Sequence, residues 1–125
     1  MLMNIPHHTS HMISAIALLF IIILVSCSNG SEEEKAQLML QEARTALRHR
    51  QYADARDTIM SLRKKHPTAI EARKQGILLL DSIEMNAAAD SLRNAEGTEW
   101  ERLSVKRKFY ERKLQEDLKR ATQDR

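Results

Sequence analysis

Cysteine, glycine, proline and aromatic residues are all scarce in this 125-residue chain. It contains one cysteine, two prolines, three glycines, one tryptophan, two tyrosines and two phenylalanines. A single cysteine excludes a disulfide bond within the chain, so packing must hold the fold together. Long stretches lack helix breakers, and they are dominated by alanine, leucine, glutamate, arginine, lysine and glutamine, which favour helices. The composition therefore predicts an all-α fold.

The residue patterns of common catalytic and metal sites are missing as well. The chain has no glycine-rich phosphate loop, no Gly-x-Ser-x-Gly turn and no cysteine–histidine pair. His49 and His66 are the only histidines after residue 26, and neither has a cysteine or carboxylate at metal-ligand spacing. Acidic residues are scattered along helix faces, whereas acid–base catalysis needs a buried pair. We therefore expect no enzyme, no catalytic residue and no metal.

Charged side chains are absent from the first 31 residues, and the 20 basic and 17 acidic residues all follow. Within this uncharged segment, residues 12–25 form an apolar run that is shorter than the about 20 residues of a transmembrane helix. A run of this length is typical of a secretory signal peptide. Residues 1–11 carry histidines in place of the usual lysine or arginine, which a true start at Met3 or Met12 would explain. A retained, uncleaved anchor is the alternative.

The single cysteine lies at the exit of this apolar run, directly after Leu24-Val25-Ser26. This arrangement resembles the lipobox of bacterial lipoproteins. The resemblance implies that the Cys27 thiol receives diacylglycerol, that the chain is cut between Ser26 and Cys27, and that the new amino terminus receives a fatty acyl chain. It implies no other cofactor. Residues 1–26 are then a signal peptide, and residues 27–31 are the lipidated cysteine with a flexible tether. A lone cysteine can otherwise be a small buried side chain or a free thiol.

The residues after Cys27 bear on the destination of such a lipoprotein. Ser28, where an aspartate would retain the protein in the inner membrane, resembles lipoproteins that move on to the outer membrane. The acidic run Glu32–Glu34 resembles the surface-export tag of some anaerobic Gram-negative bacteria, although it lies further from the cysteine. The same run alternatively forms the first turn of a helix and offsets its positive pole. We expect an outer-membrane anchor, facing the periplasm or the cell surface.

Three Ser/Thr-x-x-Glu sequences predict helix starts, because each can form a capping box. They are Ser31 with Glu34, Thr68 with Glu71, and Thr98 with Glu101. With Pro67 as a helix stop, they predict helices over about 32–49, 52–65, 69–94 and 99–122. We expect the third helix to be continuous and to end at Gly97; a break near Asn86 is the alternative. Short connections predict an antiparallel helix pair over 32–67 and a long helical hairpin over 68–125, of which only the base contacts the pair.

Apolar residues at helical spacing predict the buried face of each helix. The four predicted stripes are Ala36, Met39, Leu40, Ala43, Ala46 and Leu47 in the first helix; Tyr52, Ala55, Ile59 and Leu62 in the second; Ile70, Ile77, Leu80, Ile83 and Ala87 in the third; and Trp100, Leu103, Tyr110, Leu114, Leu118 and Ala121 in the fourth.

The first two predicted helices resemble a tetratricopeptide repeat. Ala43, Tyr52, Ala55, Ile59 and Pro67 match its small, aromatic, small, large apolar and terminal proline positions. Two positions depart from the repeat, which usually has an aromatic where Met39 stands and a small residue where Leu62 stands. The resemblance covers roughly Ala36 to Ala69. It implies a groove between the first and third helices that binds a segment of another protein.

The whole chain is also similar to a group of uncharacterised lipoproteins from anaerobic Gram-negative bacteria. These combine a lipobox, one such repeat and a long helical hairpin. A more distant likeness is to the repeat-containing lipoprotein of the outer-membrane β-barrel assembly machine, which carries several repeats.

Candidate partner-binding residues lie on the last helix: Trp100, Arg102, Lys106 and Tyr110. Trp100 either anchors a partner or fills the base of the hairpin. Basic residues crowd this helix, and a second basic region comprises Arg44, Arg48, Arg50, Arg63, Lys64 and Lys65. Both regions fit an acidic protein or lipid phosphates, or are simply solvated faces. We expect no nucleic-acid partner.

The sequence thus predicts a lipid-anchored, non-catalytic protein–protein interaction adaptor of the cell envelope. Its expected partners are the membrane, an unidentified envelope protein or a second copy of the chain. The alternatives are a self-associating, coiled-coil structural protein or an accessory factor in outer-membrane protein assembly. A small-ligand carrier would need a cavity, for which helices this rich in alanine leave little volume.

Overall fold

The computed structural model describes residues 31–123, which form four α-helices and one 3₁₀ turn and contain no strand. The elements are α2 (Glu32–Arg48), α3 (Tyr52–Lys65), α4 (Ile70–Ser91), η1 (Leu92–Asn94) and α5 (Gly97–Gln123). The predicted all-α fold class is therefore confirmed. The signal peptide, the cleavage site between Ser26 and Cys27, and most of the tether lie outside the described residues and stay predictions.

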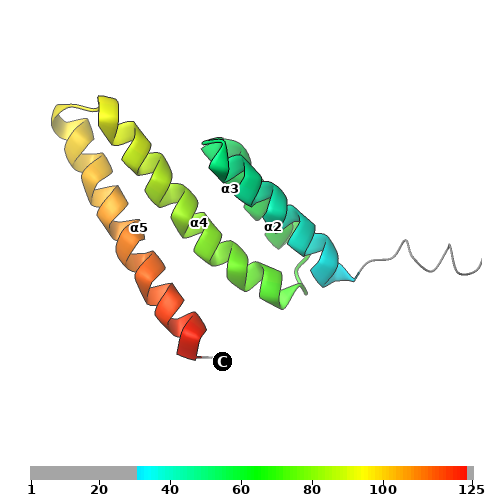
Figure 1. Cartoon of the computed structure of the whole chain (residues 1–125). Helices are drawn as coiled ribbons and strands as arrows, with labels where there is room; N and C mark the ends of the chain where they lie inside the picture. Colours follow the sequence, from blue (N-terminus) through cyan, green and yellow to red (C-terminus); the bar gives the residue numbers. More distant parts are fainter. Residues whose placement is uncertain (1–30, 124–125) are drawn as a thin grey trace, which may run out of the picture. The chain divides into compact units, whose positions relative to one another are not determined.

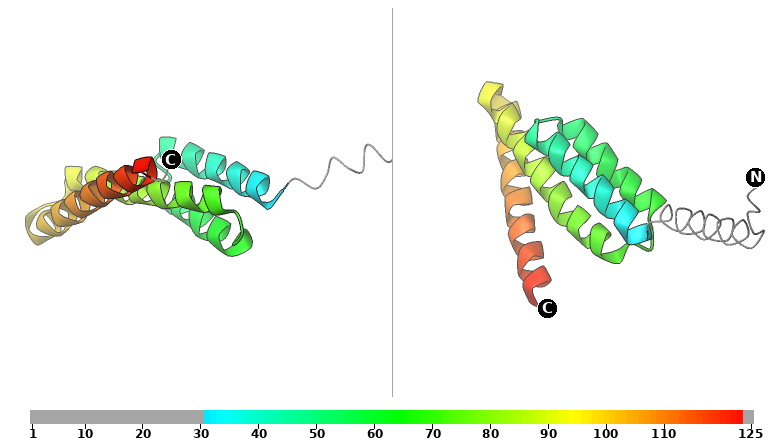
Figure 2. Two further views of the ribbon diagram at one scale, coloured as in Figure 1. Left: turned by 90° about the horizontal axis from the view of Figure 1, so that it is seen from below. Right: turned by 45° about the vertical axis from the view of Figure 1, so that its right-hand side comes forward.

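The helix α4 lies between two neighbours, as Figures 1 and 2 show. On one side it packs against the antiparallel pair α2 and α3, and on the other side α5 runs back along it. Among the described helices, α5 contacts only α4 and η1. The expectation that only the base of the hairpin would touch the first two helices is wrong, because α4 packs against them along most of its length. The described residues after Ser31 accordingly form one compact unit, which includes both the predicted helix pair and the predicted hairpin.

The turn between α2 and α3 closes α2 without a glycine. Arg50 adopts a φ of 58°, in the left-handed region that usually favours glycine. The N–H of Gln51 donates to the carbonyl of Ala46 at 2.9 Å, and the N–H of Arg50 donates to that of Leu47 at 3.0 Å. These two bonds form a Schellman motif, which satisfies carbonyls that the helix end leaves free. The chain therefore reverses direction within three residues, as the sequence predicted.

The core joins α2, α3 and α4 through side chains that are mostly small. The buried residues of α2 and α3 belong to the predicted stripes, which are therefore confirmed there: Ala36, Leu40, Ala43, Ala46, Ala55, Ile59 and Leu62 are buried, and Met39, Leu47 and Tyr52 pack against them. In the described part of the chain, the largest side chains that are fully buried are those of Leu40, Ile59, Leu62 and Ile83. A core with so many alanines requires close helix packing, because small side chains leave the helix axes near each other.

The packed face of α4 differs from the predicted stripe. Ile70 and Ile77 were expected in the core, yet they are 55% and 43% exposed. Ile83 is buried and Leu80 packs against the core, as predicted, whereas Ala69, Ala72 and Gly76 take the places expected for the two isoleucines. A Cβ on Gly76 would lie 3.6 Å from Ile59 and 3.8 Å from Leu40, so the backbone of α4 approaches these side chains closely. The exposed Ile70 and Ile77 lie beside Arg63 at the end of α3, outside this core.

Two of the three predicted capping boxes do not form. The N-cap of α4 is Ala69, which makes no side-chain capping bond, so Thr68 and Glu71 do not cap it. Burial of Ala69 in the core fixes the start of the helix one residue later than predicted. Thr98 lies inside the first turn of α5, because α5 begins at Gly97, which the sequence had placed at the end of the preceding helix. Ser31, as expected, directly precedes α2.

The third predicted helix is continuous at the position of the proposed break. Asn86 lies within α4, and its side-chain Nδ2 donates to the carbonyl of Ser82, one helical turn earlier, at 2.8 Å. The helix α4 continues to Ser91, where η1 tightens its end before Gly97, with a φ of 56°, begins α5.

Replacing Gly76 by alanine tests the close packing of α4. The added methyl group meets ordinary van der Waals contacts, and alanine favours the helix by about 1 kcal/mol over glycine. We expect Gly76→Ala to raise the free energy of unfolding of residues 28–125 by about 0.5–1 kcal/mol, measured by urea denaturation. We expect Gly76→Val to lower it by about 1–3 kcal/mol, because its extra methyl groups overfill the space beside Ile59 and Leu40. Equal destabilisation by both variants would contradict this packing.

Candidate functional site

The interface between α4 and α5 is largely polar. Leu103 is the buried apolar residue of α5, and the following positions at helical spacing are Lys106, Tyr110, Lys113 and Asp117. In an ordinary helical hairpin these positions carry apolar residues that interlock. Here ion pairs with α4 take their place, at Asp81 and Glu84. Ion pairs to Asp81 and Glu84 therefore join α5 to α4 next to the buried Leu103.

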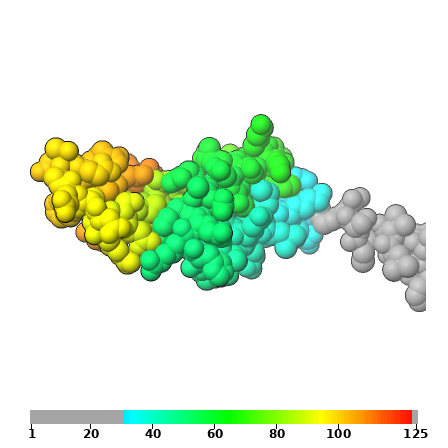
Figure 3. Space-filling view, turned by 90° about the horizontal axis from the view of Figure 1, so that it is seen from above, coloured from blue at the N-terminus to red at the C-terminus, as the bar shows by residue number. Residues whose placement is uncertain are grey.

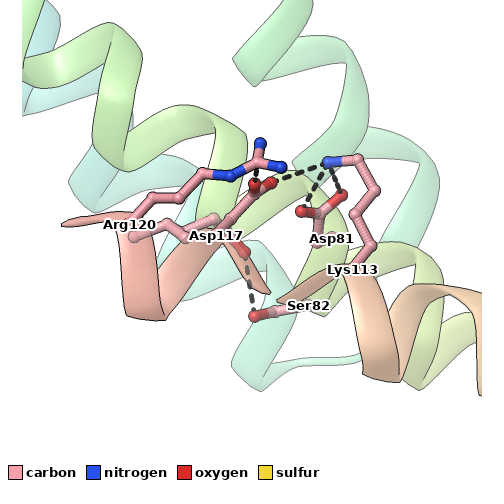
Figure 4. Close-up of polar contacts among 6 residues, drawn as sticks. Asp81, Ser82, Lys113, Asp117 and Arg120 are labelled. Carbon is pink, nitrogen blue, oxygen red and sulfur yellow. Dashed lines mark hydrogen bonds and ion pairs between the residues drawn. The ribbon is translucent and has the colours of Figure 1, made fainter. Parts of the chain in front are cut away.

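The first of these ion pairs centres on Asp81, which is only 2% exposed (Figure 4). Lys113 Nζ lies 2.9 Å and 2.8 Å from the two oxygens of Asp81, and 2.9 Å from Asp117. Arg120 adds a longer contact of 3.4 Å to Asp117. Burial raises the pKa of Asp81 and outweighs the lysine beside it, while the hydrogen bond from Lys113 lowers the pKa of Asp117. One lysine thus serves two carboxylates, of which the buried one is the harder to keep charged.

The second ion pair connects three helices through Glu84. Its carboxylate accepts hydrogen bonds from Arg56 of α3 and forms an ion pair with Lys106 of α5 at 2.8 Å. Burial alone raises the pKa of Glu84, but the two cations outweigh it, so that the net pKa is lowered. A related contact joins Tyr52 to α4, because its hydroxyl donates to Asp90. These polar contacts fix the register of α4 against both neighbours.

The four predicted partner-binding residues of α5 do not form one surface. Lys106 and Tyr110 face α4, and the Lys106 ammonium lies 5.9 Å from the centre of the Tyr110 ring. Arg102 is exposed and paired with Glu99 at 2.6 Å and 2.9 Å. Trp100 is 51% exposed, so it does not fill the hairpin; Leu103 takes that role. Only Trp100 and Arg102 therefore remain accessible to a partner.

A different stripe of α5 is open to a partner. Val105 and Phe109 are 68% and 48% exposed and lie one helical turn apart. Phe109 contacts the edge of the Tyr110 ring, with a centroid distance of 5.1 Å. The spacing of the stripe continues through Arg102 on one side and Arg112 on the other, both exposed. This stripe lies beside the face that α4 covers.

A shallow hollow of about 190 Å³ lies between the end of α3 and the start of α4. Its lining comprises Arg63, Ile70, Arg73, Lys74 and Ile77. Arg73 donates from Nη1 to the carbonyl of residue 67 at 2.6 Å, while its Nε is buried without a hydrogen-bond partner. Sequence reasoning missed this hollow because it assigned both isoleucines to the core. The signal for it was a pair of cations between two isoleucines.

The groove expected between the first and third helices is not where the hollows lie. The crevice between α2 and α4 is bridged by Arg44, which donates to Gln75 at 2.9 Å, and by Glu33, which accepts from the N–H of Ala72 at 2.7 Å. A second hollow lies on the α2–α3 surface and is acidic, with Glu42, Asp54 and Asp57 in its lining. The predicted groove stays a prediction for a partner-bound state.

The second basic region of the sequence is divided by the fold. Arg48 and Arg50 lie at the α2–α3 turn, whereas Arg63 and Lys64 lie at the other end of α3. A helix of this length separates them by about 20 Å, so they do not form one surface.

The histidines lie at the two ends of α3, as expected, and His66 Nδ1 lies 2.7 Å from a carboxylate oxygen of Glu32. Among the described residues, no three His, Cys, Asp or Glu side chains are placed so that they could hold a metal ion. No helix of residues 31–123 is both long enough and apolar enough to cross a membrane.

The polar interface predicts that removing one charge costs more than removing the pair. Lys113→Leu leaves Asp81 buried beside Asp117 without its cation, and we expect the free energy of unfolding to fall by about 2 kcal/mol. The double variant Asp81→Leu/Lys113→Leu restores an apolar contact and should be at least as stable as the native chain. Urea denaturation measures both.

The matched control for this pair is Arg120→Leu, which also removes a cation next to Asp117. Because Arg120 is exposed, its loss should change stability by less than about 0.5 kcal/mol. A double variant that is as unstable as Lys113→Leu would contradict the account of the interface.

Comparisons of this chain with family models, with curated proteins and with solved structures gave no match. The resemblance to a tetratricopeptide repeat, based on Ala43, Tyr52, Ala55, Ile59 and Pro67, stays a prediction, as does the resemblance to envelope lipoproteins. The all-α arrangement of α2 to α5 is established by the structure itself.

Proposed function

We propose that this chain is a lipid-anchored protein of the cell envelope that acts as a non-catalytic adaptor between proteins. The observation that carries the proposal is the position of the single cysteine, Cys27, directly after Leu24-Val25-Ser26 at the end of an uncharged apolar run. All charged residues follow this point. A helical unit beginning at Glu32 is then suspended from the outer membrane by a short tether.

The adaptor role is supported by the surface of α5. This helix packs on α4 alone among the described helices, so much of its surface is open. The open surface includes Val105 and Phe109, which lie one helical turn apart and are 68% and 48% exposed. Trp100 and Leu118 are also about half exposed, but helical spacing places them on a different side of α5. Apolar side chains gathered on one helix favour binding of a partner helix, which covers them and excludes water. Arg102 and Arg112 on either side of the Val105–Phe109 pair favour acidic residues in the partner.

The second candidate is self-association through the same helix. The polar α4–α5 interface leaves the apolar pair Val105 and Phe109 uncovered, so two copies can bury these residues against each other. This candidate makes the chain a structural protein of the envelope rather than an adaptor. The two functions differ only in the identity of the molecule that covers α5.

Changing Cys27 tests the anchor. In cells that make the chain naturally, we expect Cys27→Ser to abolish incorporation of a labelled fatty acid and to leave the chain uncut at its full size. The control Asn29→Ala keeps the cysteine and should be labelled and processed normally. If Cys27→Ser chains still reach the membrane fraction at the size of the native protein, the lipid anchor is wrong.

A photo-crosslinking amino acid at position 105 tests the adaptor surface. We expect crosslinks from position 105 to one other envelope protein, and none from position 38, where Leu38 is equally exposed on α2. Position 38 therefore controls for exposure, because Leu38 is as accessible as Val105 but lies on α2 and not on the Val105–Phe109 stripe. Crosslinks from position 105 only to a second copy of the chain would favour self-association, and the absence of any crosslink would reject both functions.

A further inference from the structure

The hollow between α3 and α4 lies at the end of the unit where α2 begins. His66, just after α3, lies 2.7 Å from Glu32, the first residue of α2. The N–H of Ala72, in the first turn of α4, donates to Glu33 at 2.7 Å. Figure 3 shows the α3–α4 connection, in green, beside the start of α2, in cyan. The chain therefore enters the unit next to this hollow.

The length of the tether limits how far this end can lie from the anchor. Cys27 and Glu32 are five positions apart, and a fully extended chain spans about 17 Å over that distance. With Cys27 lipidated, as the proposed function holds, the α3–α4 end stays close to the headgroups of the bilayer. The opposite end of α4 lies about 33 Å further away, at the rise of an α-helix.

The chemistry of the hollow fits an anionic headgroup. Arg63, Arg73 and Lys74 bring three cations to one small surface, with Ile70 and Ile77 exposed between them. Guanidinium groups bind phosphate with paired hydrogen bonds, and the buried Nε of Arg73 lacks a partner. Apolar side chains next to cations favour the boundary between headgroups and acyl chains.

The acidic groups near the hollow do not cancel this charge. Glu71 is paired with Lys74 at 3.2 Å, but both side chains are more than half exposed, so the contact is weak in water. Glu32 contacts His66 and Lys35, and Glu33 is held by the N–H of Ala72. Arg63 has no ion pair among the described residues, and Lys64 and Lys65 extend the basic surface along the last turn of α3.

We propose that the α3–α4 hollow binds phosphate groups of anionic lipids in the bilayer that holds Cys27. The proposal rests on the proposed lipid anchor. An acidic segment of a partner protein offers similar charges, but the tether favours the bilayer, because it keeps the headgroups at high effective concentration. Binding at this end orients α4 away from the membrane and presents the Val105–Phe109 stripe of α5 to partners.

Vesicles with a nickel-chelating lipid test this binding without the native anchor. Residues 28–125 contain the whole described core, and a histidine tag in place of Cys27 tethers them. A bimane dye on Thr68→Cys reports the hollow, and the same dye on Thr98→Cys reports the far end. We expect a quencher on the lipids to reduce bimane emission at position 68 about twofold more on phosphatidylglycerol-containing vesicles than on phosphatidylcholine alone. At position 98 the two vesicles should give the same emission.

A pair of charge-matched variants shows whether the hollow itself is responsible. Arg63→Gln/Lys74→Gln should abolish the difference between the two vesicles. Arg107→Gln/Lys108→Gln, at two exposed positions of α5, removes the same charge and should preserve it. Circular dichroism confirms that both remain helical. Equal quenching on both vesicles, or equal loss in both variants, overturns the proposal.

Two further outcomes separate this inference from its alternatives. If inorganic phosphate or an acidic peptide shifts the amide resonances of Arg63 and Arg73 while vesicles have no effect, the hollow binds a free anion or a protein, and the membrane role is wrong. Failure of Cys27 lipidation in cells overturns the anchor but leaves the vesicle result unchanged. If Cys27 is lipidated but quenching at position 68 does not depend on the vesicle composition, only the proposed binding of lipid phosphate at the hollow is wrong.

Discussion

The close approach of α4 to α2 and α3 is the constraint on which the rest of the structure depends. Gly76 and its neighbours Ala69 and Ala72 let the backbone of α4 approach Leu40 and Ile59. Because small residues occupy the first part of this side, Ile70 and Ile77 lie outside the core. The side toward α5 receives Asp81 and Glu84, and the side near the end of α3 receives two isoleucines. One packing contact thus determines where the candidate sites lie.

A charged interface gives the hairpin specificity at a cost in stability. Each buried carboxylate loses water, and its cation restores only part of that free energy. In return, the ion pairs make the pairing of the helices specific. Asp81 requires a cation opposite it on α5, and Glu84 pairs with one cation of α3 and one of α5. Val105 and Phe109 of α5 are left uncovered by α4, and they are the residues on which the proposed partner surface rests.

The sequence predicted the helices of α2 and α3, their buried stripes and their antiparallel pairing, because local periodicity and short turns determine them. It misplaced Ile70 and Ile77 of α4, which were expected in the core and are exposed. The predicted stripe of α5 is wrong at Trp100, Leu118 and Ala121, which are also exposed, because the packing against α4 uses a different side of the helix. It also assigned capping roles to Thr68 and Thr98. The real helix starts are set by the burial of Ala69 and by the left-handed backbone of Gly97, and neither is visible in a capping motif.

The sequence alone determined that this protein is helical, that its charges begin after Cys27, and that no disulfide holds it, because these follow from composition and from the order of residues. Only the tertiary structure decided which side of α4 faces the core and which charges meet across the hairpin. It also left Ile70 and Ile77 exposed beside the cations at the end of α3. The physical reason is that an α-helix offers several partly apolar sides, and the closest packing, not the largest side chains, selects the buried one.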